Sequence, residues 1–110
     1  MTTKQHTVFG VFIPQGWKME LVSISDPVDK WNKTVEIAQL AEKLGFDSIW
    51  VYDHFHNVPR PAHEAVFECW TTMAAISQRT TTIRLGQMVG CNLYREPSLL
   101  AKITSTLDVI

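Results

Sequence analysis

Three strand-like segments, each followed by a helix-like segment, constrain this 110-residue chain more than any other feature. Residues 8–13, 48–52 and 83–89 are short and rich in β-branched and aromatic side chains, which is typical of buried strands. Residues 26–45, 62–78 and 97–110 repeat apolar side chains with the period of a helix. Strands that alternate with helices indicate parallel βαβ units with right-handed crossovers. The predicted class is therefore α/β with a parallel sheet.

Turn and capping residues mark where these elements begin and end. Pro14 and Gly16 end the first strand, because proline cannot donate to a ladder and glycine tolerates unusual dihedral angles. Asp26 and Pro27 begin the first helix as its N-cap and first helical residue, and Gly45 ends it as a left-handed cap. This spacing fits an open doubly wound sheet and a closed (β/α)8 barrel equally well.

The length of the chain bears on its domain organisation. A closed barrel needs eight strand–helix units and typically about 250 residues. Three units leave both edges of the sheet without a partner strand. We therefore expect residues 1–110 to form a single partial domain that stops before a fourth strand and is inactive by itself.

The composition excludes several functional classes. Ten basic and eleven acidic residues give a net charge of −1, which predicts no general attraction to nucleic acid or to an anionic membrane. No apolar run approaches the ~20 residues that span a bilayer, and residues 1–6 lack the pattern of a signal peptide. Two cysteines, Cys69 and Cys91, are too few for a disulfide framework. These features predict a cytoplasmic protein with reduced thiols.

The segment after the second strand carries the clearest chemical signal. In parallel sheets, function gathers at the carboxyl ends of the strands, and here Asp53 and His54 occupy that position. A histidine exchanges protons near neutral pH, and a preceding carboxylate can orient its ring. Both residues are candidates for catalysis. The alternatives are a surface histidine, or a metal site in which His54 and His56 bind with help from Asp53 and His63.

Polar side chains also follow the first and third strands. Gly90 permits close approach of the backbone, while Asn92, Tyr94 and Arg95 offer groups that suit a polar ring system or an anionic tail. Candidate contacts to a substrate are Gln15, Trp17 and Glu68, although a turn, a packed aromatic side chain and a solvated helix face explain them equally well. No glycine-rich phosphate loop follows the first strand, which disfavours a dinucleotide-binding domain.

Four segments in order carry a resemblance to a known family: residues 12–15, 38–55, 67–72 and 83–110. The chain resembles the luciferase-like monooxygenase superfamily, and within it the branch that uses the deazaflavin coenzyme F420. The resemblance implies a TIM barrel, often dimeric, that holds the ring of its cofactor at the carboxyl-terminal mouth. It also implies activity on a small organic substrate.

The resemblance assigns expected roles to individual residues. Asp53 and His54 would lie beside the cofactor and substrate, with the histidine assisting as hydride moves to or from the deazaflavin. A non-prolyl cis peptide bond would lie within residues 88–90. The expected cofactor contacts are Met88, Val89, Gly90, Asn92, Tyr94 and Arg95.

Four functions remain open at this level. The first is hydride transfer between coenzyme F420 and a small organic substrate. The second keeps the fold but uses reduced FMN and oxygen in a monooxygenase. The third is a truncated, non-catalytic chain, and the fourth is a metal hydrolase built on His54 and His56.

Overall fold

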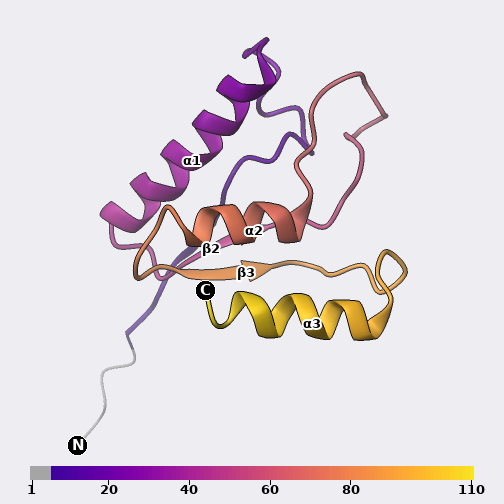
Figure 1. Cartoon of the computed structure of the whole chain (residues 1–110). Helices are drawn as coiled ribbons and strands as arrows, with labels where there is room; N and C mark the ends of the chain where they lie inside the picture. Colours follow the sequence, from indigo (N-terminus) through magenta and orange to yellow (C-terminus); the bar gives the residue numbers. More distant parts are fainter. Residues whose placement is uncertain (1–5) are drawn as a thin grey trace, which may run out of the picture.

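The computed structural model describes residues 6–110 of the chain. Residues 1–5, which belong to the segment expected to lack a signal peptide, lie outside the described part. Three strands alternate with three helices in the order β1 (Gly10–Phe12), α1 (Pro27–Lys43), β2 (Ser48–Val51), α2 (Cys69–Ser77), β3 (Arg84–Gln87) and α3 (Pro97–Leu107). This order confirms the predicted succession of strand–helix units (Figure 1).

The three strands form one parallel sheet in the order β1–β2–β3. In the register, Ile49 of β2 lies opposite Val11 of β1 and Leu85 of β3. Because all three strands run in the same direction, their carboxyl ends lie at the same end of the sheet, which we call its carboxyl edge. The loops that follow β1, β2 and β3 therefore begin side by side, which places the predicted functional segments together.

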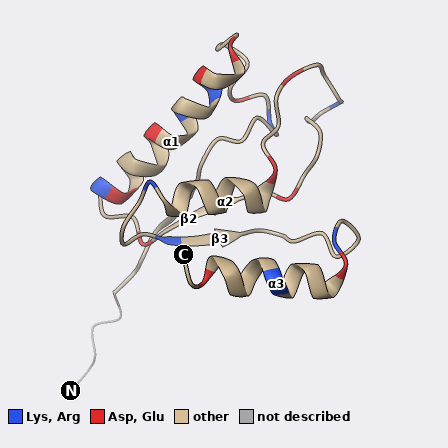
Figure 2. Ribbon diagram, in the orientation of Figure 1, with Lys and Arg blue, Asp and Glu red and all other residues tan. Residues whose placement is uncertain are grey.

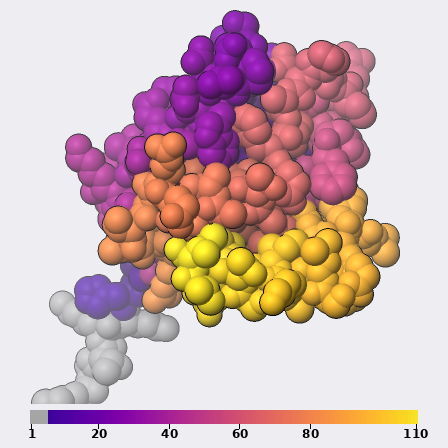
Figure 3. Space-filling view, viewed as in Figure 1, coloured from indigo at the N-terminus to yellow at the C-terminus, as the bar shows by residue number. Residues whose placement is uncertain are grey.

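The hydrophobic core lies between the sheet and the first two helices. Ile49 and Val51 of β2, each 2 % exposed, pack with Ala38 of α1 and with Met73 and Ile76 of α2. Side chains alternate between the two faces of a strand, so these residues define the face that the helices cover. Figure 3 shows the side of the molecule on which α1, α2 and α3 follow one another as adjacent bands.

The opposite face of the sheet is organised around one indole ring. A Cβ atom on Gly10 would lie 2.6 Å from Nε1 of Trp50, and a Cβ atom on Gly86 would lie 2.6 Å from its Cζ3. The ring of Trp50 therefore lies across both neighbouring strands, and it donates a hydrogen bond of 2.9 Å to Oγ of Ser48. Glycine in β1 and β3 leaves the space that this ring fills.

The limits of α1 agree with the sequence signals. Asp26 is the N-cap, and its side chain accepts hydrogen bonds from the amides of Val28 and Asp29. Pro27 is the first helical residue, and Gly45 follows the helix with a positive φ of 81°. Capping therefore fixes both ends of this helix, as local residue chemistry predicts.

The predicted start of the second helix is wrong. The helix begins at Cys69 instead of Ala62, because residues 62–68 form a loop that Gln15 holds away from helical geometry. The side chain of Gln15 donates to the carbonyl oxygen of Phe67, and the amide of Phe67 donates to the carbonyl oxygen of Gln15 at 2.9 Å. Glu68 then serves as the N-cap of α2. Strands β1 and β3 are also shorter than predicted, at both of their ends.

Helix α3 packs less closely than the other two. None of its side chains is buried, and Leu99 is 52 % exposed. A hollow of about 510 Å³ separates it from α2 and β3 and reaches Trp50, Leu85 and Leu107. No helix within residues 6–110 combines the length and the apolar character needed to cross a bilayer.

Candidate functional site

The loops after β2 and β3 are joined by a buried ion pair at the carboxyl edge of the sheet. Arg95 donates from Nη1 to Oδ2 of Asp53 at 2.7 Å and from Nη2 to Oδ1 at 2.9 Å. The backbone amide of Cys91 donates a further hydrogen bond to Oδ2 at 2.9 Å. The structure therefore brings together two segments that lie about 40 residues apart in the sequence.

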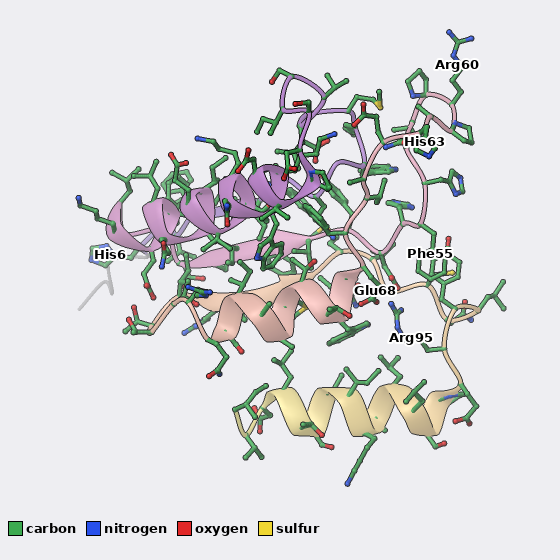
Figure 4. The ribbon with its side chains drawn as sticks, turned by 45° about the horizontal axis from the view of Figure 1, so that its top comes forward. His6, Phe55, Arg60, His63, Glu68 and Arg95 are labelled. Atoms are coloured by element: carbon green, nitrogen blue, oxygen red, sulfur yellow. The ribbon has the colours of Figure 1, made fainter. Side chains whose placement is uncertain are left out.

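Glu68 completes this arrangement from the N-cap position of α2. Its Oε1 accepts a hydrogen bond from Nη2 of Arg95, and its Oε2 accepts one from the amide of Thr71 at 2.7 Å. Figure 4 shows the side chains of Arg95 and Glu68 directed toward each other near the start of α2. We name Asp53, Glu68 and Arg95 the rim cluster.

Burial and charge explain how the rim cluster is ionised. The side chains of Asp53 and Arg95 are 0 % and 9 % exposed. Burial raises the pKa of the Asp53 carboxyl, but the hydrogen bonds from Arg95 and Cys91 outweigh it, and the pKa is lowered. The hydrogen bond to Asp53 raises the pKa of Arg95.

Glu68 follows the same balance. Burial raises the pKa of the Glu68 carboxyl, but hydrogen bonds from Thr71 and Arg95 outweigh this effect, so the pKa is lowered overall. One guanidinium cation therefore serves two carboxylate anions at neutral pH. Elsewhere on the chain, basic and acidic residues are interspersed along the ribbon (Figure 2).

The expected contact between Asp53 and the ring of His54 is not what the structure shows. Both carboxylate oxygens of Asp53 are occupied by Arg95 and by the amide of Cys91. The ring of His54 instead stacks on Trp17, with ring centroids 4.1 Å apart and planes inclined by 15°. The sequence correctly places Asp53 at the rim, but its side chain faces Arg95 across the sheet edge.

Four aromatic rings line the rim beside β1. The ring centroids of Trp17 and Tyr52 lie 4.3 Å apart, and Tyr52 stacks on Phe12 with a centroid distance of 4.2 Å. We name Phe12, Trp17, Tyr52 and His54 the aromatic row. A hollow of about 650 Å³ adjoins Phe12 and Tyr52, but its lining includes neither His54 nor any member of the rim cluster. The aromatic row thus presents one imidazole, that of His54, beside the rings of Phe12, Trp17 and Tyr52.

The segment after β3 presents a second, mostly apolar surface. Met88 and Val89 are 46 % and 74 % exposed, and the peptide bond between them is cis, which confirms the non-prolyl cis bond expected there. Tyr94 stacks on Phe55 at 4.0 Å and links this segment to the loop after β2. Asn92 is exposed beside them. Flat aromatic and aliphatic groups with a nearby amide suit a planar conjugated ring.

Gln15 has a different part from the substrate contact that the sequence predicts. Its side chain is 1 % exposed, its Nε2 donates to the carbonyl oxygens of Tyr52 and Phe67, and its Oε1 accepts from the amide of Tyr52. The side-chain amide is therefore occupied by backbone groups. Gln15 therefore positions Tyr52, the residue that precedes Asp53.

Arg95 is also unlike its prediction as a cofactor contact. Both of its terminal nitrogens donate to carboxylates of the rim cluster, which uses three of the five N–H groups of the guanidinium. Glu68 is held by the same contacts, although its side chain stays 37 % exposed. Neither the pairing of these residues nor the stack of Phe55 on Tyr94 could be read from local pattern. The available signal was that polar and aromatic side chains follow neighbouring parallel strands.

The structure gives no support to a metal centre. Within residues 6–110, no group of three or more histidine, cysteine, aspartate or glutamate side chains could hold a metal ion. His63, one of the expected extra ligands, lies with Arg60 on the outer part of the loop after β2, away from Glu68 and Arg95 (Figure 4).

Comparison with known proteins identifies relatives of the chain. The sequence profile described as "Luciferase-like monooxygenase" matches residues 7–110. The chain is 30 % identical over 86 residues to 5,10-methylenetetrahydromethanopterin reductase of Methanolobus tindarius, covering 78 % of this chain and 23 % of that protein. It is 29 % identical over 90 residues to F420-dependent hydroxymycolic acid dehydrogenase of Mycobacterium tuberculosis, covering 81 % and 25 %. The chain thus spans about a quarter of the length of these relatives.

Two solved structures share the fold. One is an F420-dependent secondary alcohol dehydrogenase in complex with an F420–acetone adduct, with a TM-score of 0.63 and 28 % identity, covering 90 % of this chain and 27 % of that one. The other is the oxygenating constituent of 3,6-diketocamphane monooxygenase of Pseudomonas putida in complex with FMN, with a TM-score of 0.68 and 17 % identity, covering 93 % and 26 %. The identity to the second structure supports the fold alone. The parallel strand–helix units therefore correspond to part of a TIM barrel.

Proposed function

Because the chain belongs to the luciferase-like monooxygenase family, we propose that it serves in an oxidoreductase that transfers hydride between coenzyme F420 and a small organic substrate. The relatives with F420 in their names and the alcohol dehydrogenase bound to an F420–acetone adduct support the choice of cofactor. An alcohol or its ketone is accordingly the substrate class that we favour.

The observation that carries this proposal is that the loop after β2 and the loop after β3 meet at the carboxyl edge of the sheet. The ion pair between Asp53 and Arg95 and the stack of Phe55 on Tyr94 tie the loop after β2 to the loop after β3. Ligands of open and closed parallel sheets bind at this edge. The imidazole of the aromatic row, that of His54, lies there stacked on Trp17.

The residues of the chain fit a deazaflavin ring. Met88 and Val89 would lie against the ring, Gly90 would let the backbone approach it, and Asn92 and Tyr94 would offer hydrogen bonds at its polar edge. The deazaflavin, when bound, supplies the carbon that accepts or donates hydride. Three of the five N–H groups of Arg95 donate to carboxylates of the rim cluster, so we assign Arg95 to holding the loops together instead of to the ring.

His54 is the group that we assign to proton transfer. When an alcohol loses hydride from carbon, its hydroxyl proton must leave as well, and a ring nitrogen of His54 can accept it. In the reverse direction the same nitrogen returns the proton to the carbonyl oxygen. Trp17 holds the imidazole by stacking, and it also walls the substrate side of the site. Its stacking leaves the ring nitrogens uninvolved in the contact.

A binding and turnover experiment tests this function. F420 and FMN are titrated separately into the oxidoreductase in which this chain serves, with absorbance spectra and the unfolding temperature as readouts. We expect F420 to raise the unfolding temperature and FMN to leave it unchanged. We then expect His54→Gln to bind F420 but to lose a factor of about 10²–10⁴ in turnover with small alcohols.

The matched control is His56→Gln, because His56 is exposed and lies two residues from His54 in the same loop. It should keep both cofactor binding and turnover. Stabilisation by FMN alone would instead indicate the flavin monooxygenase. Stabilisation by neither cofactor would contradict the proposal, as would equal loss of turnover in the two histidine variants.

A further inference from the structure

We propose that Arg95 is a positioning residue, which holds the loop after β2 against the loop after β3 and thereby sets the place of His54 at the rim. This inference rests on the proposed function, since it concerns the histidine that we assign to proton transfer. It differs from the sequence prediction, in which Arg95 contacts the cofactor directly.

Three separate elements meet at this one guanidinium group. Asp53 comes from the loop after β2, Glu68 from the N-cap of α2, and Arg95 itself from the loop before α3. The two terminal nitrogens of Arg95 each bind a different oxygen of Asp53, and Nη2 also binds Glu68. A planar fork of this kind fixes both the distance and the orientation of a carboxylate. A lysine ammonium carries the same charge but has no such fork.

The anchored residue is the immediate neighbour of His54. Consecutive Cα atoms are about 3.8 Å apart, so a fixed Asp53 leaves His54 little freedom to move as a unit. One residue further on, Phe55 stacks on Tyr94, which is itself the neighbour of Arg95. Residues 53–55 are thus held against residues 94–95 by a buried ion pair and by a ring stack. Between these two contacts, the ring of His54 turns to the other side and stacks on Trp17.

Arg95 is the one cation of the rim cluster, and its two partners are both carboxylates. The side chain of Asp53 is 0 % exposed, and among residues 6–110 the only other donor to its carboxylate is the amide of Cys91. Without Arg95, two carboxylates would face each other across the space that the guanidinium fills. Truncation of one partner leaves a buried charge without compensation and can prevent folding. The test therefore removes both charges together.

The principal variant is the double substitution Arg95→Met with Asp53→Asn, which removes both charges of the buried pair and leaves only Glu68 without its partner, whose side chain is 37 % exposed. Arg95→Lys keeps the positive charge and removes only the fork. The matched control is Arg84→Met, because the side chain of Arg84 is 80 % exposed and its ion pair with Asp47 is 3.8 Å long. Circular dichroism and the unfolding temperature report whether each variant folds.

The first readout is the proton resonance of the His54 ring, measured by NMR without any cofactor and assigned with His54→Gln. Stacking on Trp17 places these ring protons within the aromatic ring current, which shifts their resonances upfield. We expect the double variant and Arg95→Lys to lose this shift while keeping their helices. The second readout is the dissociation constant for F420, which we expect to rise about tenfold in both variants, as for the loss of a charge-assisted hydrogen bond. Arg84→Met should change neither.

The outcomes separate this inference from the proposed function. If the folded double variant and Arg95→Lys both keep the His54 resonances and the F420 affinity of the parent protein, then Arg95 does not position His54, and the inference is overturned while the proposed function stands. If the parent protein binds no F420, the proposed function fails, yet the NMR shift still decides whether Arg95 sets the position of His54.

Discussion

Replacement of Gln15 by methionine tests how the rim is built. Methionine has nearly the same volume and flexibility as glutamine, so the substitution keeps the packing of a side chain that is 1 % exposed. It removes three hydrogen bonds. Two are donated by Nε2 to the carbonyl oxygens of Tyr52 (3.0 Å) and Phe67 (3.1 Å), and one is donated by the amide of Tyr52 to Oε1 (2.5 Å).

The expected loss of stability follows from these three bonds. A buried polar group that loses its partner costs about 1–3 kcal/mol. Tyr52 and Phe67 are only partly buried, so water can replace part of what is lost, and the lower limit applies to each bond. The free energy of unfolding should therefore fall by about 3 kcal/mol, which is a large share of the 5–15 kcal/mol typical of a folded domain.

Urea denaturation followed by circular dichroism measures this change. The matched control is Gln39→Met, because Gln39 is exposed and makes one hydrogen bond of 3.0 Å to the carbonyl oxygen of Arg79. The control should stay within about 0.5 kcal/mol of the parent chain. If the two variants unfold at the same urea concentration with the same slope, the reasoning that gives Gln15 a structural part is refuted.

Three further predictions concern other parts of the fold. Gly86→Ala should lower the free energy of unfolding by about 1–3 kcal/mol, because the new methyl group would lie 2.6 Å from the ring of Trp50. The control in the same denaturation assay is Gly90→Ala, because only the flexible side chain of Gln87 opposes a methyl group there. Backbone hydrogen bonds from residues 81–83 lower the pKa of Glu42 from 4.5 to about 2, so its contribution to stability should be complete above pH 4.5 and disappear as the pH falls toward 2. Unfolding temperatures of the parent chain and of Glu42→Gln should accordingly converge over that range, and a constant difference would contradict the argument. Burial raises the pKa of Cys69 to about 12, so this thiol should resist iodoacetamide at pH 8 in the folded chain and react once urea is added, as mass spectrometry of its peptide would show.

Local patterns in the sequence determined the arrangement of elements and the edge at which the site lies. Capping is a contact between residues two or three apart, so Asp26 and Gly45 marked the ends of the first helix reliably. Parallel strand–helix units bring the ends of neighbouring strands to one edge by topology alone. For this reason the sequence predicts that the segments carrying Asp53 and Arg95, which follow neighbouring strands, lie at the same end of the sheet.

The partners of individual side chains were decided by tertiary structure. Asp53 pairs with a residue 42 positions away instead of with the neighbouring His54, and Gln15 binds backbone groups 37 and 52 positions away instead of a ligand. The start of α2 moved to Cys69 for the same reason, since the hydrogen bonds between Gln15 and Phe67 hold the preceding loop. A residue's own chemistry says which groups it can bind, but the distance to a buried partner is fixed only when the sheet and its loops have assembled.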